Sequence, residues 1–271
     1  MLTRHEDVVA IHKKDLPLTA ERVSPLMNQL PEAIQAEVQP LRNHLQAWMQ
    51  MIEPPHHTRL RNLESKAFTS RMVEDLRPRV QHVVDALLDA IGDAGETDMI
   101  HNFAGPLPTV VIGEMLGIPT SDQAQFKEWS DNIAVVLEGV GPTIVEQVRV
   151  GHQSVLELTE YISAIAEQRR KRPERDLITA LVAVEDDGDK LSGEELIGMC
   201  SFLLVAGNET TTGLVGNGLL ALLQNPDEMQ KLKSDPELIK NAIEEFIRYD
   251  GPLHRNTRVA TEDFEFRGKQ N

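Results

Sequence analysis

The feature that most constrains the fold is a long, uninterrupted helical pattern over residues 192–224. Ser192 and Glu195 have the spacing of a capping box, which marks the start of a helix. Asn225 and Pro226 mark its end, because proline cannot continue a helix. A helix of about 30 residues is about 45 Å long at 1.5 Å per residue. We therefore expect one long central helix.

The same helix contains Ala206-Gly207-Asn208-Glu209-Thr210-Thr211, which suits a helix interior poorly. Glycine there costs about 1 kcal/mol relative to alanine, and threonine loses rotamer freedom. One explanation is an opening at Gly207 that lets a flat ligand or another backbone come close to the helix. Glu209 and Thr210 would then present a carboxylate and a hydroxyl beside that opening. The other explanation is a simple kink with a solvated Glu209, and the local pattern leaves both open.

Most of the remaining chain also has helical periodicity. Apolar residues recur at helical spacing between Leu76 and Ile91, with Pro78 expected in the first turn of that helix. The other expected helices cover 121–138, 142–172 and 235–249, with a turn at 186–189 and short strands at 257–260 and 264–266. No break separates two domains, so we interpret 1–271 as one mainly α domain with small β-sheets.

Composition excludes several classes of function. The formal net charge is −16, with 43 acidic and 27 basic residues, which argues against nucleic acid as a main partner. A single cysteine, Cys200, excludes a disulfide framework and a multi-cysteine zinc site, and it fits a reducing compartment. The first residues do not form a signal peptide, and no window approaches the roughly 18 apolar residues of a membrane span. We predict a cytoplasmic protein.

Two shorter motifs each place a pair of ionisable side chains at helical spacing. Glu245 and Arg248 are three residues apart and share a helix face, although taken alone such a pair is usually exposed and worth about 0–1 kcal/mol. His57 and Arg61 are four residues apart on a segment that follows two prolines. They could hold a carboxylate together, and the alternative is an ordinary amphipathic helix with a basic rim.

In their order along the chain, these segments resemble the cytochrome P450 superfamily of haem-thiolate monooxygenases, in its soluble bacterial form. Residues 206–211 are similar to the signature of the family's helix I, and 245–248 to the Glu-x-x-Arg motif of its helix K. Residues 53–61 resemble the segment that opens its helix C. Residues 2–8 resemble the strand and entry to helix B, and 255–263 the strand after helix K. Five ordered matches extend the resemblance over essentially the whole chain.

The resemblance implies haem b as cofactor and assigns roles to particular residues. Ala206 and Gly207 would lie against the haem, and Gly207 would let the helix bend over its distal face. Glu209 and Thr210 would form the catalytic acid–alcohol pair that delivers protons. The remaining roles are propionate binding by His57, Arg61 and Arg258, and a buried structural ion pair of Glu245 with Arg248.

The resemblance also implies that the chain is truncated at both ends. The family's iron ligand is a cysteine on a Gly-rich loop well after helix K, and no such loop occurs before Asn271. Cys200 lies about two turns, or about 10 Å, before Gly207 on the distal side, where we expect a small buried apolar residue. His254 and His56 are alternative ligands on chemical grounds alone. We assign no metal ligand and expect the chain by itself to bind haem weakly and to be inactive.

For the complete parent, the resemblance implies oxygen insertion into a lipophilic small molecule with electrons from a ferredoxin-type partner. A second hypothesis is a haem-free scaffold or activator of a partner enzyme, and a third is a plain helical domain with chance motifs. Helix faces built to pack on an absent segment would be exposed and apolar, which favours self-association. The substrate does not follow from the sequence.

Overall fold

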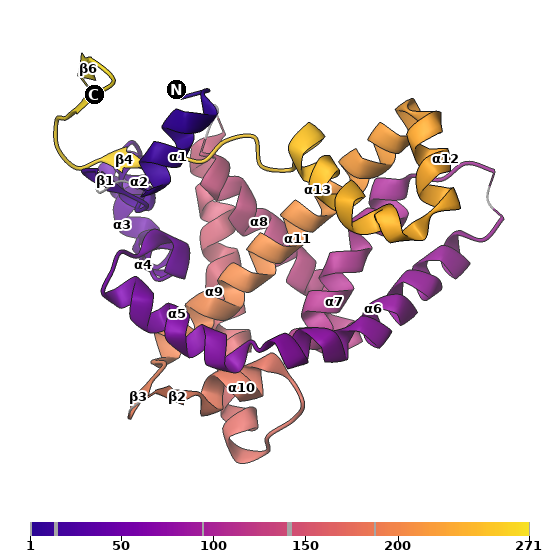
Figure 1. Ribbon diagram of the computed structural model, residues 1–271. Helices are drawn as coiled ribbons and strands as arrows, with labels where there is room; N and C mark the ends of the chain where they lie inside the picture. The colour runs from indigo at the N-terminus through magenta and orange to yellow at the C-terminus, as the bar shows by residue number, and fades with distance from the viewer. Residues whose placement is uncertain (1, 14–15, 94, 140–142, 187, 271) are drawn as a thin grey trace.

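Helix α11 (Gly193–Gln224) runs diagonally through the centre of the computed structural model, which describes residues 2–13, 16–93, 95–139, 143–186 and 188–270 (Figure 1). The Ser192 hydroxyl accepts the N–H of Glu195 at 3.1 Å, and the Glu195 carboxylate accepts the N–H of Ser192 at 2.8 Å. The predicted capping box and the long central helix are therefore confirmed. The helix stays α-helical through the glycine-containing segment 206–211.

Helices make up most of the structure around α11. The N-terminal half contains α1 (His5–Lys13), α2 (Val23–Met27), α3 (Glu32–Glu37), α4 (Gln39–Gln46), η1 (Met49–Met51), α5 (His56–Ala67), α6 (Ser70–Ile91), the π-helical η2 (Ile100–Ala104), α7 (Pro106–Leu116), η3 (Thr120–Asp122) and α8 (Gln123–Glu138). The C-terminal half contains α9 (Ile144–Lys171), α10 (Leu177–Ala183), α12 (Pro226–Ser234), η4 (Pro236–Leu238) and α13 (Ile239–Asp250).

Three small antiparallel sheets of two strands complete the described part of the chain. They pair β1 (Leu18–Thr19) with β4 (Val259–Ala260), β2 (Glu185–Asp186) with β3 (Asp189–Lys190), and β5 (Glu265–Phe266) with β6 (Lys269–Gln270). The β1–β4 pair brings the two ends of the chain together (Figure 1). The predicted fold class, mainly α with small β-sheets, is confirmed.

The main hydrophobic core lies where α8 and α9 pack against each other and against the first half of α11. Its largest fully buried side chains include Phe126, Ile133, Leu158 and Ile162. Small residues allow this packing, because a Cβ at Gly151 of α9 would lie 2.4 Å from a methyl group of Val136 on α8. The second half of α11 contacts α12 and α13 and has few buried side chains.

Two local expectations were wrong. Helix α6 begins at Ser70, where the hydroxyl of Thr69 accepts the N–H of Met72 at 3.2 Å, so Pro78 lies inside the helix and not in its first turn. The helix tolerates the missing hydrogen bond because Glu74, whose carbonyl loses its donor, is exposed to water. The strand expected within 2–8 is also absent from these residues, since α1 already begins at His5.

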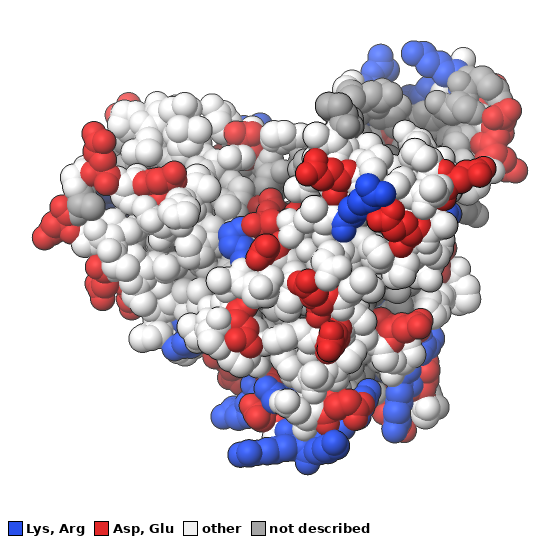
Figure 2. Space-filling model, turned by 180° about the vertical axis from the view of Figure 1, so that it is seen from behind, with Lys and Arg blue, Asp and Glu red and all other residues white. Residues whose placement is uncertain are grey.

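The other expected elements agree with the structure to within a few residues. The turn predicted at 186–189 joins β2 to β3, although its Asp187 lies outside the described residues, as does Pro142 at the expected start of α9. None of the helices in the described ranges is long and apolar enough to cross a membrane. Acidic side chains are spread over the rear face, and basic ones gather at its lower edge and at the upper right of the view (Figure 2).

A half-buried histidine, His44, joins α4 to α11. The Nε2 atom of His44 lies 2.8 Å from the hydroxyl oxygen of Ser201, which is fully buried. The imidazole also meets the ring of Trp48 edge-on, with the ring centroids 6.2 Å apart. Burial lowers the pKa of His44 to about 4, because a charged imidazolium would lose its hydration here.

We expect this histidine to make the fold sensitive to acid. An unfolded histidine titrates near pH 6.5 and the folded one near 4, so the unfolded state binds more protons between these values. The free energy of unfolding should therefore fall by about 3 kcal/mol as the pH drops from about 7 to about 4. Urea unfolding of the wild type and His44→Gln over this range measures the effect. A difference between the two proteins that does not change with pH would contradict it.

Candidate functional site

Gly207 lies where α11 packs against α7. A Cβ at this position would be 2.5 Å from Cδ1 of Ile112, a side chain of α7. That distance is far below van der Waals contact, so a larger residue would require the Ile112 side chain to move. The opening expected at Gly207 is therefore occupied by the side chain of a neighbouring helix.

The residues that follow Gly207 divide between two sides of α11. The Thr210 hydroxyl is half-buried and donates to the carbonyl oxygen of Ala206 at 2.6 Å, whereas Glu209 is exposed. Asn208 faces the interior, where its side chain lies 3.0 Å from the hydroxyl of Thr109 on α7. Asn208 was not among the predicted site residues, and its neighbours in sequence give no signal that it is buried.

Helix α5 carries the next two predicted residues. His57 is half-buried near the start of the helix, and Arg61 is exposed one turn later on the same face. Arg61 is not free in this structure, because its Nη1 donates to the carboxylate of Glu64 at 2.8 Å. A ligand that binds Arg61 would compete with this pair or share the guanidinium with it.

Arg59 lies between His57 and Arg61 on α5 and makes a network of hydrogen bonds that was not predicted from the sequence. Its guanidinium donates to Asp189 at 2.5 Å and to Glu195 at 2.6 Å, and also to the carbonyl oxygen of Lys190 at 2.9 Å. The carboxylate of Asp189, followed by that of Glu195, raises the pKa of Arg59 above its ordinary value. Since Glu195 belongs to the capping box of α11, Arg59 ties α5 to β3 and to the start of the central helix.

Arg258 reaches its position from the other end of the chain. It directly precedes β4, is half-buried, and donates to Oδ1 of Asn256 at 2.7 Å and to the carbonyl oxygen of Thr257 at 3.0 Å. Among the described residues, no hydrogen bond or ion pair links Arg258 to His57 or Arg61. The three predicted propionate ligands therefore come from two separate elements, α5 and the segment before β4.

The predicted ion pair on α13 forms, but it is not buried. Arg248 donates to both carboxylate oxygens of Glu245, at 2.6 and 2.7 Å, and lowers the pKa of that carboxyl. The two side chains are 69% and 55% exposed, respectively. The expectation of a buried pair is thus wrong for this chain, because α13 packs on α11 through Phe246 and leaves this face to solvent.

Helix α13 also exposes an apolar row. Ile239, Ile243 and Ile247 repeat every fourth residue and are each between 42% and 49% exposed. Leu253, just after the helix, is 75% exposed. These side chains form the kind of exposed apolar face that the sequence predicted.

The candidate iron ligands do not form a metal site. Cys200 is 1% exposed, and burial raises the pKa of its thiol to about 12. His56 lies 3.4 Å from Glu195, and His254 lies 3.2 Å from Asp250. Within the described ranges, no cluster of three or more His, Cys, Asp or Glu side chains could hold a metal ion.

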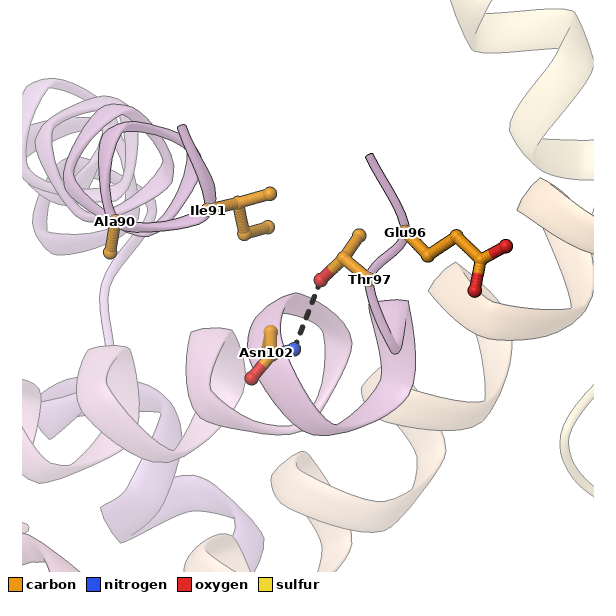
Figure 3. A pocket seen from close by; sticks show the side chains of 5 residues that line it. All are labelled: Ala90, Ile91, Glu96, Thr97 and Asn102. Atoms are coloured by element: carbon orange, nitrogen blue, oxygen red, sulfur yellow. Dashed lines mark hydrogen bonds between the residues drawn. The ribbon is translucent and has the colours of Figure 1, made fainter. Parts of the chain in front are cut away.

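A shallow cavity of about 260 Å³ lies elsewhere, between the end of α6 and η2 (Figure 3). Ala90 and Ile91 form one side, and Thr97 and Asn102 the other, with the Asn102 amide donating to the Thr97 hydroxyl at 3.0 Å. Most of these side chains are exposed, and none was predicted to have a functional role. We assign no function to this cavity.

Comparison with known proteins places this arrangement in a family. The family model for cytochrome P450 matches residues 35–270. Cytochrome P450 CYP107DY1 of Priestia megaterium is 38% identical over 98% of this chain and 65% of its own length. The polyketide biosynthesis cytochrome P450 PksS of Bacillus subtilis is 38% identical over 99% of this chain and 64% of its own length.

Solved structures agree with this assignment. The structure of P450BioI in complex with a hexadec-9Z-enoic acid ligated acyl carrier protein has a TM-score of 0.86 and 31% identity, covering 98% of this chain and 66% of that one. The fold is that of a cytochrome P450. This chain belongs to the cytochrome P450 family. It spans just under two thirds of the length of these relatives.

Proposed function

We propose that the whole protein containing this chain is a monooxygenase that inserts one atom of dioxygen into a lipophilic small molecule, with electrons from a ferredoxin-type partner. The observation that carries the proposal is the half-buried Thr210 hydroxyl, next to Glu209 in the sequence, on the central helix of a cytochrome P450 fold. Relatives named as vitamin D(3) 25-hydroxylase and 6-deoxyerythronolide B hydroxylase, 40% identical each, support a lipophilic substrate. The single buried thiol supports a cytoplasmic location.

The residues present fit part of a haem group. His57, Arg61 and Arg258 supply the imidazole and guanidinium donors that suit propionate carboxylates. Ala206 and Thr210 are half-buried on the side of α11 proposed to face the ring. Haem, when bound, supplies the activation of dioxygen. The one ligand these residues do not supply is a thiolate, because Cys200 is a buried, protonated thiol.

The proposed catalytic role of α11 is proton transfer. In the structure the Thr210 hydroxyl donates to the Ala206 carbonyl, so its oxygen keeps lone pairs with which to accept a hydrogen bond. Rotation about the Cα–Cβ bond would free the same proton for donation towards the reacting oxygen. We propose that the Glu209 carboxylate, exposed on the preceding residue, takes a proton from solvent and passes it on.

Thr210→Val tests this role in the whole protein. The substitution keeps the shape of the side chain and removes the hydroxyl, so we expect product formed per dioxygen consumed to fall by about a hundredfold. Thr211→Val is the matched control, because Thr211 is exposed on the same helix and has no proposed role. Equal loss in both variants, or no loss in Thr210→Val, would refute the proton-transfer role. Oxygen uptake and product yield are the measurements.

A second candidate is a haem-free scaffold that activates a partner enzyme. The observation in its favour is the exposed apolar row of α13, which offers a docking or self-association surface. Pull-down from cells with the product of a neighbouring gene, followed by an assay of that enzyme with and without this chain, separates the two functions. Self-association is measured by light scattering after size exclusion.

A further inference from the structure

Helix α11 makes polar contacts with its neighbours in the two turns that flank Thr210. Asn208 and Thr212 lie two residues before and two residues after Thr210, so both project from the side of the helix roughly opposite to it. Asn208 is buried and Thr212 is half-buried. Their partners belong to η2 and the first turns of α7, which pack along this side of α11.

Thr212 supplies a hydrogen bond that the α-helical pattern cannot provide at the start of α7. In that pattern the carbonyl oxygen of Ala104 would accept the N–H of the residue four positions later, but this residue is Pro108, which has no N–H. The Thr212 hydroxyl donates to this carbonyl at 3.1 Å. Because Ala104 is buried, a donor from α11 takes the place that water would fill at the surface.

Asn208 reaches the same part of α7 through a second buried hydroxyl, that of Thr109. The Thr109 oxygen lies 3.0 Å from the carbonyl oxygen of Gly105 and 3.0 Å from Oδ1 of Asn208. A hydroxyl has one proton, so it can donate to only one of these two oxygens at a time. Gly105 alone would already satisfy Thr109, and the Asn208 amide adds a link from α7 to α11.

The Asn208 amide is an unfavourable group for this position if only stability is considered. Its Nδ2 atom is buried and has no hydrogen-bond partner among the described residues. A buried polar atom without a partner destabilises the folded state, and an apolar side chain of similar size, such as leucine, would avoid this cost. The stability of the fold therefore does not explain the amide, whereas its directional contact with Thr109 fixes how α11 lies against α7.

We propose that Asn208 and Thr212 are positioning residues for the proton transfer assigned to Thr210. They attach α11 to α7 and η2 on either side of Thr210 along the helix, and so fix the backbone that carries its hydroxyl. A small displacement of a group that transfers a proton causes a large loss of rate. The inference rests on the proposed function, because Asn208 and Thr212 act only through Thr210.

Asn208→Leu in the whole protein separates positioning from support of the fold. The substitution removes the unpartnered amide and leaves Thr109 with Gly105 as its acceptor, so the thermal midpoint should stay unchanged or rise. Product formed per dioxygen consumed should nevertheless fall by about fivefold or more, because the Thr210 hydroxyl is less well placed. Asn217→Leu is the matched control: Asn217 lies on the same helix but donates to α13, and its loss should leave the yield unchanged.

Thr212→Val tests the second contact without relying on activity. Hydrogen exchange on the 271-residue chain should become about tenfold faster at the amides of residues 105–109, relative to those of α9, because the Ala104 carbonyl loses its donor from α11. Thr211→Val makes the same chemical change at the adjacent exposed residue and should leave this exchange as in the wild type. Equal exchange in the two variants would contradict the attachment of α7 to α11 through Thr212.

The double variant Asn208→Leu/Thr210→Val shows whether Asn208 acts through Thr210. Its product yield per dioxygen should equal that of Thr210→Val alone, whereas two independent losses would multiply. A multiplied loss, an unchanged yield in Asn208→Leu, or a clear fall in the thermal midpoint of Asn208→Leu overturns the inference. Failure of the monooxygenase proposal would appear differently, as a wild type that forms no product or a Thr210→Val variant that loses no yield.

Discussion

The reduced 271-residue chain is expected to show no thiolate-type Soret band with carbon monoxide. Such a band requires a cysteine thiolate on the iron, and Cys200 is the single cysteine of this sequence. Its thiol is 1% exposed, and burial raises its pKa to about 12, so almost no thiolate exists near neutral pH. It also lies on α11, the helix that carries the proposed proton-transfer residues.

Cys200→Ala is the control for this experiment. Any haem spectrum recorded with the chain should be the same in this variant, because the buried thiol does not reach the iron. A thiolate-type band in the wild type that disappears in Cys200→Ala would overturn the assignment of Cys200 as a structural residue. A histidine-type spectrum would instead indicate that a histidine binds the iron, with His56 and His254 as the candidates.

Asp176→Ala is expected to cause the largest loss of stability among single substitutions of charged residues. Asp176 accepts the Nε–H of the buried Arg169 at 2.5 Å, and as N-cap of α10 it also accepts the N–H of Thr179 at 2.7 Å. Removal of the carboxylate leaves a buried guanidinium without this partner and the helix without its cap. The free energy of unfolding should fall by about 3–5 kcal/mol, measured by urea denaturation.

Glu167→Gln is the matched control for Asp176→Ala. Glu167 pairs with Arg170 on the same helix, α9, but both side chains are about half exposed. We expect a change below about 1 kcal/mol, because water solvates the separated charges. Asp176→Asn keeps a helix cap and removes the charge, so its loss of stability should lie between those of Asp176→Ala and Glu167→Gln. A loss in Asp176→Ala no larger than in Glu167→Gln would show that the buried pair is not a stabilising contact.

Features set by residues close together in the sequence were predictable. The capping box at Ser192 needs only the spacing of a hydroxyl and an acid, and the apolar periodicity of α6 and α9 needs only one helix face. Pro78 was misplaced because a strong N-cap at Thr69 starts the helix earlier, on a surface where water replaces the lost hydrogen bond. The family motifs on α5, α11 and α13 were recognisable for the same reason, since each is a local pattern.

Contacts between distant segments were not predictable from those patterns. Nothing near Gly207 indicates that Ile112 would fill the space beside it. Arg59 looked like part of a basic rim until the fold placed it against Asp189 and Glu195. The three-residue spacing of Glu245 and Arg248 was enough to predict their ion pair. Its exposure was not predictable, because it depends on which segments pack against α13.

The sequence by itself determined the family and the long central helix, and it singled out the residues proposed to transfer protons, because all of these depend on local spacing and on the order of motifs. Only the tertiary structure decided how those residues are used. It filled the space at Gly207 and tied α5 to α11 through Arg59. Such contacts depend on the packing of segments far apart in the chain, which no local periodicity encodes.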